Sequence, residues 1–452
     1  MNILKNQKCK IIITDMGSKG EAIGKADGYV IFTDEGIIGD EVEVVIEYIK
    51  KNCAYAHTLR IIKESKYRVK SKCPVSKICG GCSLQELEYS EQLKLKKKIV
   101  KENFKRIAGK EIQIDNVIGM TNPYRYRNKG QYPIGYLKNE VISGFYKTGT
   151  HEIAPVKDCI LHKEISNNIV FDLTKFFQKN KVSIYNENTK TGNIRRIVIK
   201  IGFKTSEIMV IIVTKHQELN YSEQIVGFLT EKYPSIKTIV QNIQHLDNNV
   251  ILGKQNKILY GDGKITDILG DLTFEISPNS FYQVNPVQTE KLYDAAIQKA
   301  GFKGDETVLD LYCGIGTISL FASKYVKKVI GVEIVSEAVE NAKNNMKLNK
   351  ISNVEFISGK AEELFEDISK KNKIDALFLD PPRKGCDKRL ILETVKQKIP
   401  KIIYISCNSA TLARDALIFE ENGYEVKNPT LVDMFCHGMN IESVVLISRK
   451  ET

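Results

Sequence analysis

Residues 308–317 read VLDLYCGIGT, an apolar run that ends in a turn with two glycines. The run predicts a buried strand, and the apolar residues from Ile318 onward predict a helix. Glycines in such a turn let the backbone approach a ligand closely at the carboxyl end of the strand. The next predicted strand ends in Gly331-Val332-Glu333, where a carboxylate can accept hydrogen bonds from a ribose. This stretch therefore predicts a nucleoside-type ligand at the edge of a parallel sheet.

The residues around this stretch repeat the same strand–helix texture from about residue 276 to the end. Apolar β-branched runs that alternate with helices predict a mainly parallel sheet covered on both faces. The predicted strands are TVLDLYCG, KVIGVEI, VEFISG, DALFLDPP, KIIYISCN and SVVLISR. Residues 276–452 are therefore expected to form an α/β, Rossmann-like domain.

Two further regions precede this domain. Residues 1–62 contain short alternating strands with glycine-bearing turns (KCKIIITDMG, GYVIFTDEG, DEVEVVIEYIKK and YAHTLRIIK), which predict a small OB-like β-barrel of the kind that binds oligonucleotides. Residues 63–275 are expected to form an α+β central domain, with a helix near 84–109 and a strand pair in RRIVIKIG and EIMVIIVT. The predicted apolar face of that helix comprises Leu84, Leu87, Leu93, Ile99, Phe104 and Ile107.

Two features of the 308–317 region favour S-adenosylmethionine over a dinucleotide. The turn lacks the third glycine that lets a pyrophosphate approach the helix. The fourth predicted strand ends in Asp380-Pro381-Pro382, at the edge where methyl donor and target base meet in methyltransferases. The sequence therefore predicts a methyl-donor site here.

The carboxyl ends of two other strands supply a candidate catalytic pair. Cys407 follows the strand 401–406, and Glu442 opens an otherwise apolar strand, where a carboxylate is costly unless it is used or solvated. A thiolate that adds to carbon 6 of uracil turns carbon 5 into a nucleophile, and a base must then remove the carbon 5 proton. We expect nearby polar or positive groups, Arg414 among them, to lower the pKa of the thiol.

Charge and hydropathy indicate a polyanion partner. The net charge of the 452-residue chain is +12, and residues 50–110 alone contain 17 Lys and Arg against 5 Asp and Glu. Such a concentrated basic segment is typical of proteins that bind nucleic acid. The segment 124–129, YRYRNK, interleaves aromatic and cationic residues and is either an RNA contact or an ordinary surface strand. No apolar run approaches the roughly 20 residues of a membrane span, so we expect a cytoplasmic protein without membrane contact or an obligate protein partner.

Taken together and in order, these motifs resemble the RNA uracil-5 methyltransferase family. They are FYQVNP at 281–286, DLYCGIGT at 310–317, LDPPRKG at 379–385, SCN at 406–408, TLARD at 411–415, DMF at 433–435 and IE at 441–442. The resemblance covers nearly the whole chain, and the first 62 residues are similar to a TRAM domain, an RNA-binding barrel. The chain departs from the usual pattern at Cys436, where proline is common, and at Asn440, where histidine is frequent.

The resemblance implies roles for individual residues. Cys407 is expected to be the nucleophile and Glu442 the proton acceptor. The expected S-adenosylmethionine contacts are Gln283, Tyr312, Glu333, Asp380 and Thr317.

Cysteines at 73, 79 and 82 form a compact chelating pattern with Gly80 and Gly81 between them, and Cys159 is a plausible fourth ligand. Spacing alone leaves zinc and an iron–sulfur cluster open. The resemblance to the 23S ribosomal RNA branch implies a [4Fe–4S] cluster on Cys73, Cys79, Cys82 and Cys159, with zinc as the alternative occupant.

The same branch implies 23S ribosomal RNA as substrate, before the ribosome is fully assembled, with transfer RNA as the alternative. An RNA cytosine-5 methyltransferase would carry a cysteine after the proline in the 380–383 motif, where this chain has Pro382 and Arg383. An amino-group methyltransferase would carry an aromatic residue there and would not need Cys407. A non-catalytic RNA-binding iron–sulfur protein would not need either set of motifs.

Overall fold

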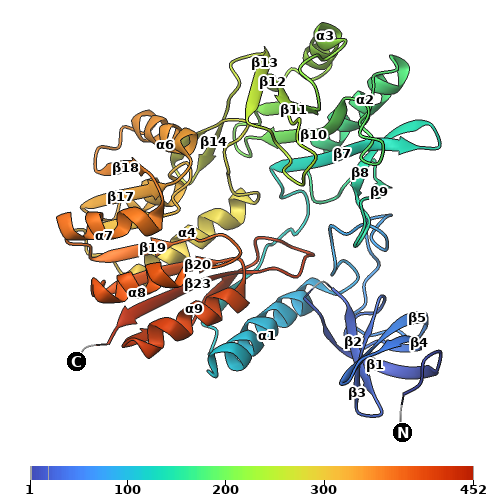
Figure 1. Ribbon diagram of the computed structural model, residues 1–452, viewed down its shortest axis with the longest axis horizontal. Coiled ribbons are helices and arrows are strands. Elements are labelled where there is room, and N and C mark those ends of the chain that lie inside the picture. The colour runs from blue at the N-terminus through green and yellow to red at the C-terminus, as the bar shows by residue number, and fades with distance from the viewer. Residues whose placement is uncertain (1–2, 19, 451–452) are drawn as a thin grey trace.

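The computed structural model describes residues 3–18 and 20–450. Figure 1 shows three regions: a barrel at the lower right, a second sheet above it, and a larger sheet with helices on the left. In the part of the chain that is described, no helix combines the length and apolar character needed to cross a membrane. The predicted α/β domain with an N-terminal barrel is confirmed by this arrangement.

The barrel is closed by strands in the order β1-β2-β3-β5-β4. Alternate residues of each strand point into it, as the sequence predicts, and Ile11, Ile31 and Val44 lie in its buried core. The strands are β1 (Lys8–Met16), β2 (Ala22–Ala26), β3 (Tyr29–Thr33), β4 (Glu41–Ile49) and β5 (Cys53–Lys63). β2 was not among the predicted strands, because AIGKA contains too few apolar residues to show a clear alternation.

Helix α1 (Tyr89–Ala108) connects the barrel to the large sheet, where it packs against α9 (Ser409–Glu421) (Figure 1). Its buried residues are Gln92, Leu95, Lys96, Val100 and Phe104. The predicted apolar face is therefore only partly right: Ile107 is exposed, while a glutamine and a lysine are buried in its place.

The central sheet has the strand order β13-β12-β11-β10-β7-β8-β9. The predicted strand pair is confirmed as the antiparallel neighbours β10 and β11. Its strands and helices are β7 (Lys129–Leu137), β8 (Glu140–Tyr146), β9 (Ile153–Pro155), α2 (Glu164–Lys179), β10 (Ile194–Ile201), β11 (Ile208–Thr214), α3 (Ser222–Lys232), β12 (Ile236–Ile243) and β13 (Gln255–Tyr260). A separate hairpin, β14 (Ile265–Leu269) and β15 (Leu272–Ile276), follows it.

The large sheet has the order β18-β17-β16-β19-β20-β23-β22-β6, with β21 paired to β23. The strands from β18 to β20 are parallel, and β23 is antiparallel to β20. The strands are β16 (Thr307–Leu311), β17 (Lys328–Glu333), β18 (Val354–Ser358), β19 (Ala376–Leu379), β20 (Lys401–Ser406), β21 (Tyr424–Val426), β22 (Thr430–Val432) and β23 (Glu442–Arg449). The helices are α4 (Pro286–Ala300), α5 (Thr317–Ala322), α6 (Ser336–Leu348), α7 (Ala361–Lys371) and α8 (Lys388–Lys396), besides α9.

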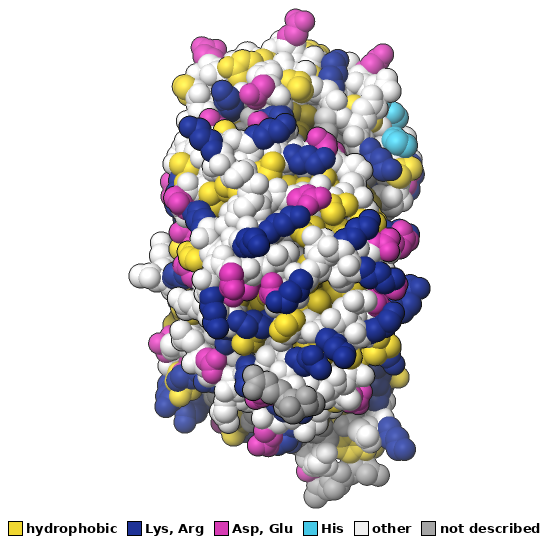
Figure 2. All heavy atoms as spheres, turned by 90° about the vertical axis from the view of Figure 1, so that its left-hand side faces the viewer, with side chains coloured by type: hydrophobic (Ala, Val, Ile, Leu, Met, Phe, Trp, Pro, Cys, Tyr) yellow, Lys and Arg dark blue, Asp and Glu magenta, His cyan; other side chains and the backbone are white. Residues whose placement is uncertain are grey.

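One strand of this sheet comes from far upstream in the sequence. β6 (Asn116–Ile118) pairs in parallel with β22, and residues such as Val100 and Ile112 join the core of the large sheet. The segment after the barrel therefore completes the large domain instead of belonging to the central sheet alone. Figure 2 shows the side at the left of Figure 1, where Lys and Arg side chains are scattered among Asp and Glu and form no continuous basic patch.

Candidate active site

The turn after β16 adopts a backbone that glycine favours. Gly314 has φ 56° and Gly316 has φ 81°, and a Cβ added to Gly316 would lie 2.6 Å from Cζ of Phe356. Tyr312 also has a positive φ, 68°, which is uncommon for a residue with a side chain and is found at ligand sites. The turn thus exposes backbone at the carboxyl end of the first strand, where the sequence predicted a ligand.

Glu333 at the end of β17 supports this turn. Its carboxylate accepts a hydrogen bond from the Gly314 N–H at 3.1 Å and another from the Val335 N–H at 2.9 Å. A cavity of about 620 Å³ opens beside it, lined by Tyr312 and Ile334 on one side and by Pro382 and Cys386 on the other. The cavity has the size of a small-molecule site and lies outside the carboxyl ends of the strands.

Carboxylates gather at this edge of the sheet. Asp310 is fully buried, and its Oδ1 has no hydrogen-bond partner among the described residues. Burial, and then the charges of Asp380 and Glu333, raise the pKa of Asp310 to about 7, and burial raises the pKa of Asp380 to about 7 as well. Mutually repelling carboxylates with an unpaired oxygen fit a ligand that brings positive charge, as the sulfonium and ammonium groups of S-adenosylmethionine do.

Four of the predicted cofactor residues are not among those that line this cavity: Glu333, Asp380, Gln283 and Thr317. Thr317 begins α5, and its hydroxyl is hydrogen-bonded to Tyr293 at 2.8 Å. Gln283 is half-buried in the segment before α4, where its carbonyl oxygen accepts a hydrogen bond from Asn128 Nδ2. The structure therefore places Tyr312 on the cavity wall, and the roles of the other four residues stay predictions.

The two predicted catalytic residues lie at the ends of two adjacent antiparallel strands: Cys407 directly follows β20, and Glu442 begins β23. Ser406 of β20 is paired with Ser443 of β23. Continuing this register by one residue places Cys407 opposite Glu442, at the end of β20 that neighbours β19 and Asp380. Residues that are 35 positions apart in the sequence are thus brought together by strand pairing.

Electrostatics link this pair. Burial, and then the negative charge of Glu442, raise the pKa of Cys407 to about 11, while the positive charge of Arg383 opposes the shift. Burial, and then the charge of Asp380, raise the pKa of Glu442 to about 8. We expected neighbouring groups to lower the pKa of Cys407, and this expectation is wrong because burial and the carboxylates outweigh Arg383.

Arg383 was missed as a site residue, and Arg414 was wrongly considered. Arg414 donates hydrogen bonds to Asp415 and to the carbonyl oxygen of Lys384, so its guanidinium is used within the fold. The positive charge of Arg383 instead lowers the pKa of both Cys407 and Glu442, against the effect of burial. Its place directly after Asp380-Pro381-Pro382, at the end of a parallel strand, was the available sequence signal.

A second cavity, of about 470 Å³, opens at Cys407 and Asn408. Its opposite wall comes from the barrel and from α1, including Phe32, Lys98 and Arg106. The cleft between barrel and nucleophile thus has an aromatic ring, which suits stacking on a nucleic-acid base. Its basic residues stand beside the acidic Asp15 and Glu102, and Lys98 forms an ion pair with Asp15.

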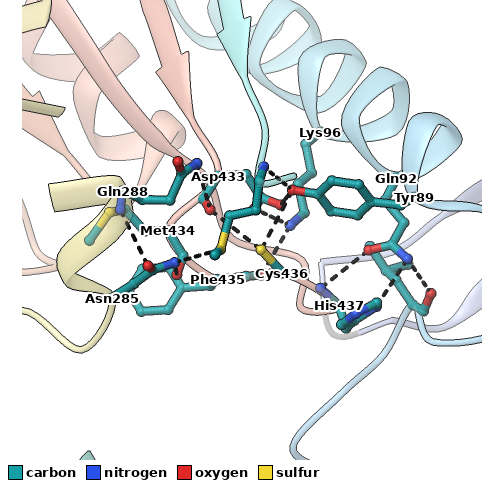
Figure 3. A network of polar contacts seen from close by, with 12 residues as sticks. Tyr89, Gln92, Lys96, Asn285, Gln288, Asp433, Met434, Phe435, Cys436 and His437 are labelled. Atoms are coloured by element: carbon teal, nitrogen blue, oxygen red, sulfur yellow. Dashed lines mark hydrogen bonds and ion pairs between the residues drawn. The ribbon is translucent and has the colours of Figure 1, made fainter. Parts of the chain in front are cut away.

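The hairpin loop 433–441, which leads into Glu442, is held by a buried polar network (Figure 3). Lys96 Nζ donates to Asp433 Oδ1 at 2.6 Å and to the Phe435 carbonyl oxygen at 3.1 Å. Asn285 Nδ2 donates to the Met434 carbonyl oxygen at 3.2 Å. Helices α1 and α4 therefore hold this loop from two sides.

The other end of the network contacts the loop that contains Cys73, Cys79 and Cys82. The carbonyl oxygen of His437 accepts hydrogen bonds from the N–H groups of Ser83 and Leu84, directly after Cys82. Gln92 contacts Nδ1 of His437 at 3.2 Å, and Tyr124 stacks on its ring with centroids 4.8 Å apart. Burial lowers the pKa of His437 to about 4, so this imidazole is neutral near pH 7.

Two side chains of the segment 124–129 are used within the fold. Tyr126 is buried and donates a hydrogen bond to the Cys436 carbonyl oxygen at 3.2 Å, and Arg125 forms an ion pair with Asp158. Tyr124 is only partly buried, so an RNA contact by this segment stays a prediction.

All four predicted cluster ligands, Cys73, Cys79, Cys82 and Cys159, line one cavity. Their thiols are free, and burial raises the pKa of Cys82 to about 12 and that of Cys159 to about 11. Within residues 3–18 and 20–450, no group of three or more His, Cys, Asp or Glu side chains is arranged to hold a metal ion. Arg127 and His162 also line the cavity, and Nε of Arg127 and Nδ1 of His162 lack partners among the described residues.

The parallel sheet, the glycine turn and the cavity at the carboxyl ends of the strands are typical of an S-adenosylmethionine-dependent methyltransferase. The profile of the tRNA (uracil-5-)-methyltransferases matches residues 88–450, and the TRAM domain profile matches residues 4–59. The chain therefore belongs to the RNA uracil-5 methyltransferase family and carries a TRAM domain. The family and the TRAM domain imply that it binds RNA.

Curated relatives and a solved structure agree with this assignment. An uncharacterized RNA methyltransferase of Clostridium tetani is 44% identical over 99% of this chain and 97% of the relative. A second, from Caldanaerobacter subterraneus, is 43% identical over 99% of this chain and 100% of the relative. The structure of Pyrococcus abyssi tRNA (uracil-54, C5)-methyltransferase in complex with S-adenosyl-L-homocysteine is similar with a TM-score of 0.77 and 25% identity, covering 97% of this chain and 100% of that one.

Proposed function

We propose that the protein methylates carbon 5 of a uridine in RNA through a covalent bond between Cys407 and carbon 6 of the base. The observation that carries this proposal is the register of β20 and β23, in which Ser406 pairs with Ser443; continued by one residue, it supports a position of Cys407 opposite Glu442. A nucleophile and a base on facing strands can act on adjacent carbons of one ring. Membership of the uracil-5 family supports the same chemistry.

Each side chain has a defined task in this mechanism. The Cys407 thiolate attacks carbon 6, which makes carbon 5 nucleophilic. S-adenosylmethionine supplies the methyl group that carbon 5 takes. The Glu442 carboxylate then removes the carbon 5 proton, and elimination expels the thiolate and restores the ring. The positive charge of Arg383 favours the ionised forms of both Cys407 and Glu442.

The proposed cofactor contacts combine Tyr312, which lines the first cavity, with residues that the family resemblance implies. We infer that Glu333 holds the ribose, that Tyr312 lines the adenosine side, and that Asp380 faces the positive end of the methyl donor. Gln283 and Thr317 complete the proposed set. The unpaired Oδ1 of Asp310 and the raised pKa of Asp380 support a cationic ligand at this edge.

A covalent trap tests the chemistry directly. RNA that contains 5-fluorouridine has no carbon 5 proton to remove, so the adduct with Cys407 should persist on a denaturing gel when S-adenosylmethionine is present. Cys407→Ala should lose the adduct, and Cys53→Ala, at an unrelated cysteine, should keep it. Methylation of uridine by Cys407→Ala at the wild-type rate would contradict the mechanism.

We propose 23S ribosomal RNA, before complete ribosome assembly, as the substrate. The barrel and the cysteine-lined cavity support this choice, since both accompany the ribosomal branch that the sequence resembles. Transfer RNA is the second candidate, because the Pyrococcus abyssi tRNA enzyme matches the chain along its full length. Purified enzyme should incorporate methyl groups into protein-free 23S RNA and not into transfer RNA, and mapping of 5-methyluridine in both RNAs from a deletion strain decides between them.

We also propose a [4Fe–4S] cluster on Cys73, Cys79, Cys82 and Cys159. Four free thiols on one cavity and unpartnered nitrogen atoms of Arg127 and His162 suit an anionic cluster that accepts N–H···S hydrogen bonds. Such a cluster, with every iron ligated by cysteine, would be structural.

Anaerobic reconstitution tests this assignment. Metal analysis should find iron and sulfide in equal amounts with a broad visible absorption, and Cys82→Ser should lose both. Cys53→Ser serves as the control and should keep them. Stoichiometric zinc without sulfide would identify the alternative occupant.

A further inference from the structure

Asp433 is held on every polar atom that it presents (Figure 3). Its carboxylate accepts from Lys96 Nζ at 2.6 Å and from the Tyr89 hydroxyl at 2.8 Å. Its backbone N–H donates to the Ile118 carbonyl oxygen at 2.9 Å, and its carbonyl oxygen accepts from Gln288 Nε2 at 3.3 Å. One residue thereby joins α1, β6 and α4.

This clamp lies at the base of the hairpin that presents the proposed base. In the pairing of β22 with β23, Val432 is the direct partner of Glu442. Asp433 follows Val432 at once, so the clamped residue adjoins the strand pair that fixes Glu442. Cys407 directly follows β20, the other neighbour of β23, and so is attached to a different strand from the clamped residue.

The energetics of the pair argue against a role in stability alone. Both side chains of the Lys96–Asp433 ion pair are fully buried. The cost of removing two charges from water largely offsets their attraction, and a well-packed apolar pair of similar size is often as stable. The ion pair instead restricts position, because a buried charge is stable only when its partner lies in one of a few places.

We propose that Lys96, through Asp433, is a positioning residue that holds the hairpin 433–441 so that the Glu442 carboxylate faces carbon 5 of the base bound to Cys407. This inference rests on the proposed function and assigns the proton-removal step to a network that begins on α1. Tyr89 shares the task, because its hydroxyl also accepts a hydrogen bond from the Met120 N–H at 2.9 Å.

The proposal predicts which step fails. Addition of Cys407 to carbon 6 and methyl transfer to carbon 5 do not use Glu442. Without a well-placed base the methylated adduct keeps its carbon 5 proton and cannot eliminate. A variant of Lys96 should therefore accumulate a covalent enzyme–RNA adduct that contains the transferred methyl group, with ordinary uridine RNA and no fluorine.

The experiment compares four full-length variants with the wild type, using RNA that carries the methylated uridine and methyl-labelled S-adenosylmethionine. Lys96→Met removes the charge at nearly equal volume. Tyr89→Phe removes only one hydroxyl and serves as the milder variant if Lys96→Met does not fold. Glu442→Gln is the reference for a missing base. Lys370→Met is the control, because Lys370 forms an exposed ion pair with Glu366 on α7.

We expect Lys96→Met or Tyr89→Phe to retain methyl label in a covalent adduct, with kcat reduced about tenfold or more and KM for RNA near the wild-type value. Lys370→Met should behave as the wild type. If Glu442→Gln traps the adduct and neither network variant does, the positioning role is overturned while the proposed function stands. If Glu442→Gln also fails to trap it, the proposed function and the positioning role both fall.

Discussion

Lys96 Nζ lies 2.6 Å from Asp433 Oδ1, and both side chains are fully buried although 337 residues separate them in the sequence. The pair joins the helix beside the barrel to the hairpin that leads into Glu442. Removal of one partner would leave the other charge buried and unpaired.

Lys96→Met should therefore lower the free energy of unfolding by about 3–5 kcal/mol, because it strands the Asp433 carboxylate. Urea unfolding followed by circular dichroism measures this loss. The exposed control Lys370→Met should leave it nearly unchanged. Equal losses for the two substitutions would show that the buried ion pair contributes no more to the free energy of unfolding than an exposed one.

The reactivity of Cys407 should depend on Glu442. The negative charge of Glu442 contributes to raising the pKa of the thiol to about 11. Glu442→Gln removes this charge, so the thiol should ionise at lower pH and iodoacetamide should alkylate it faster at pH 9. Peptide mapping of alkylated Cys407 between pH 7 and 11 gives the apparent pKa. An unchanged profile in the variant would mean that the two groups do not interact.

Glu442 should also make stability fall as pH rises. Its pKa is about 8 in the folded protein, above an unfolded value of about 4.3, so between these values the native state binds a proton that the unfolded chain has lost. Glu442→Gln abolishes this dependence and should be more stable than the wild type by about 2–4 kcal/mol at pH 8, with little difference near pH 4.5. Denaturant titrations at both pH values measure the difference in the free energy of unfolding between the variant and the wild type. A difference of the same size at both pH values would contradict the prediction.

Gly316→Ala should damage the cofactor site. The positive φ costs a side chain about 1–2 kcal/mol, and the added Cβ would lie 2.6 Å from the ring of Phe356, at a further cost of about 1–3 kcal/mol. Gly423→Ala is the matched control, because Gly423 has φ 85° and nothing within 4 Å of its Cβ position. Calorimetry should find weaker S-adenosylhomocysteine binding only in Gly316→Ala, and equal binding in both variants would count against the assignment of the cavity.

Phe32→Ala should weaken RNA binding without slowing the chemistry. Phe32 lines the same cleft as Cys407 and stacks on Tyr55 with ring centroids 5.3 Å apart. Loss of one stacking contact costs about 1–3 kcal/mol, so KM for RNA should rise by about fivefold or more while kcat stays near the wild-type value. Tyr260→Ala, an exposed aromatic residue on β13, is the control. A reduced kcat with unchanged KM would remove Phe32 from the RNA path.

The sequence was informative where structure is local. The strands of the large sheet, the glycine turn at 314–316 and the positions of Cys407 and Glu442 at strand ends follow from patterns of apolar and turn residues over short windows. These patterns hold because backbone geometry and burial of one face depend mainly on near neighbours. The family motifs then predicted the class of reaction.

Other features depend on partners distant in sequence. Lys96, Lys97 and Lys98 are identical neighbours, yet only Lys96 is buried, because Asp433 meets that face of α1. β6 was missed because three residues carry little pattern, and its place in the sheet comes from pairing with β22.

Short sequence patterns were enough to predict the α/β fold, the barrel and the candidate nucleophile and base. The three-dimensional arrangement was needed to show that β20, which ends just before Cys407, pairs with β23, which begins at Glu442. It was also needed to show that Arg383 rather than Arg414 opposes the rise in the pKa of the thiol, which burial causes. Strand order, burial and electrostatic coupling are set by contacts between segments, and no single window of the sequence contains those contacts.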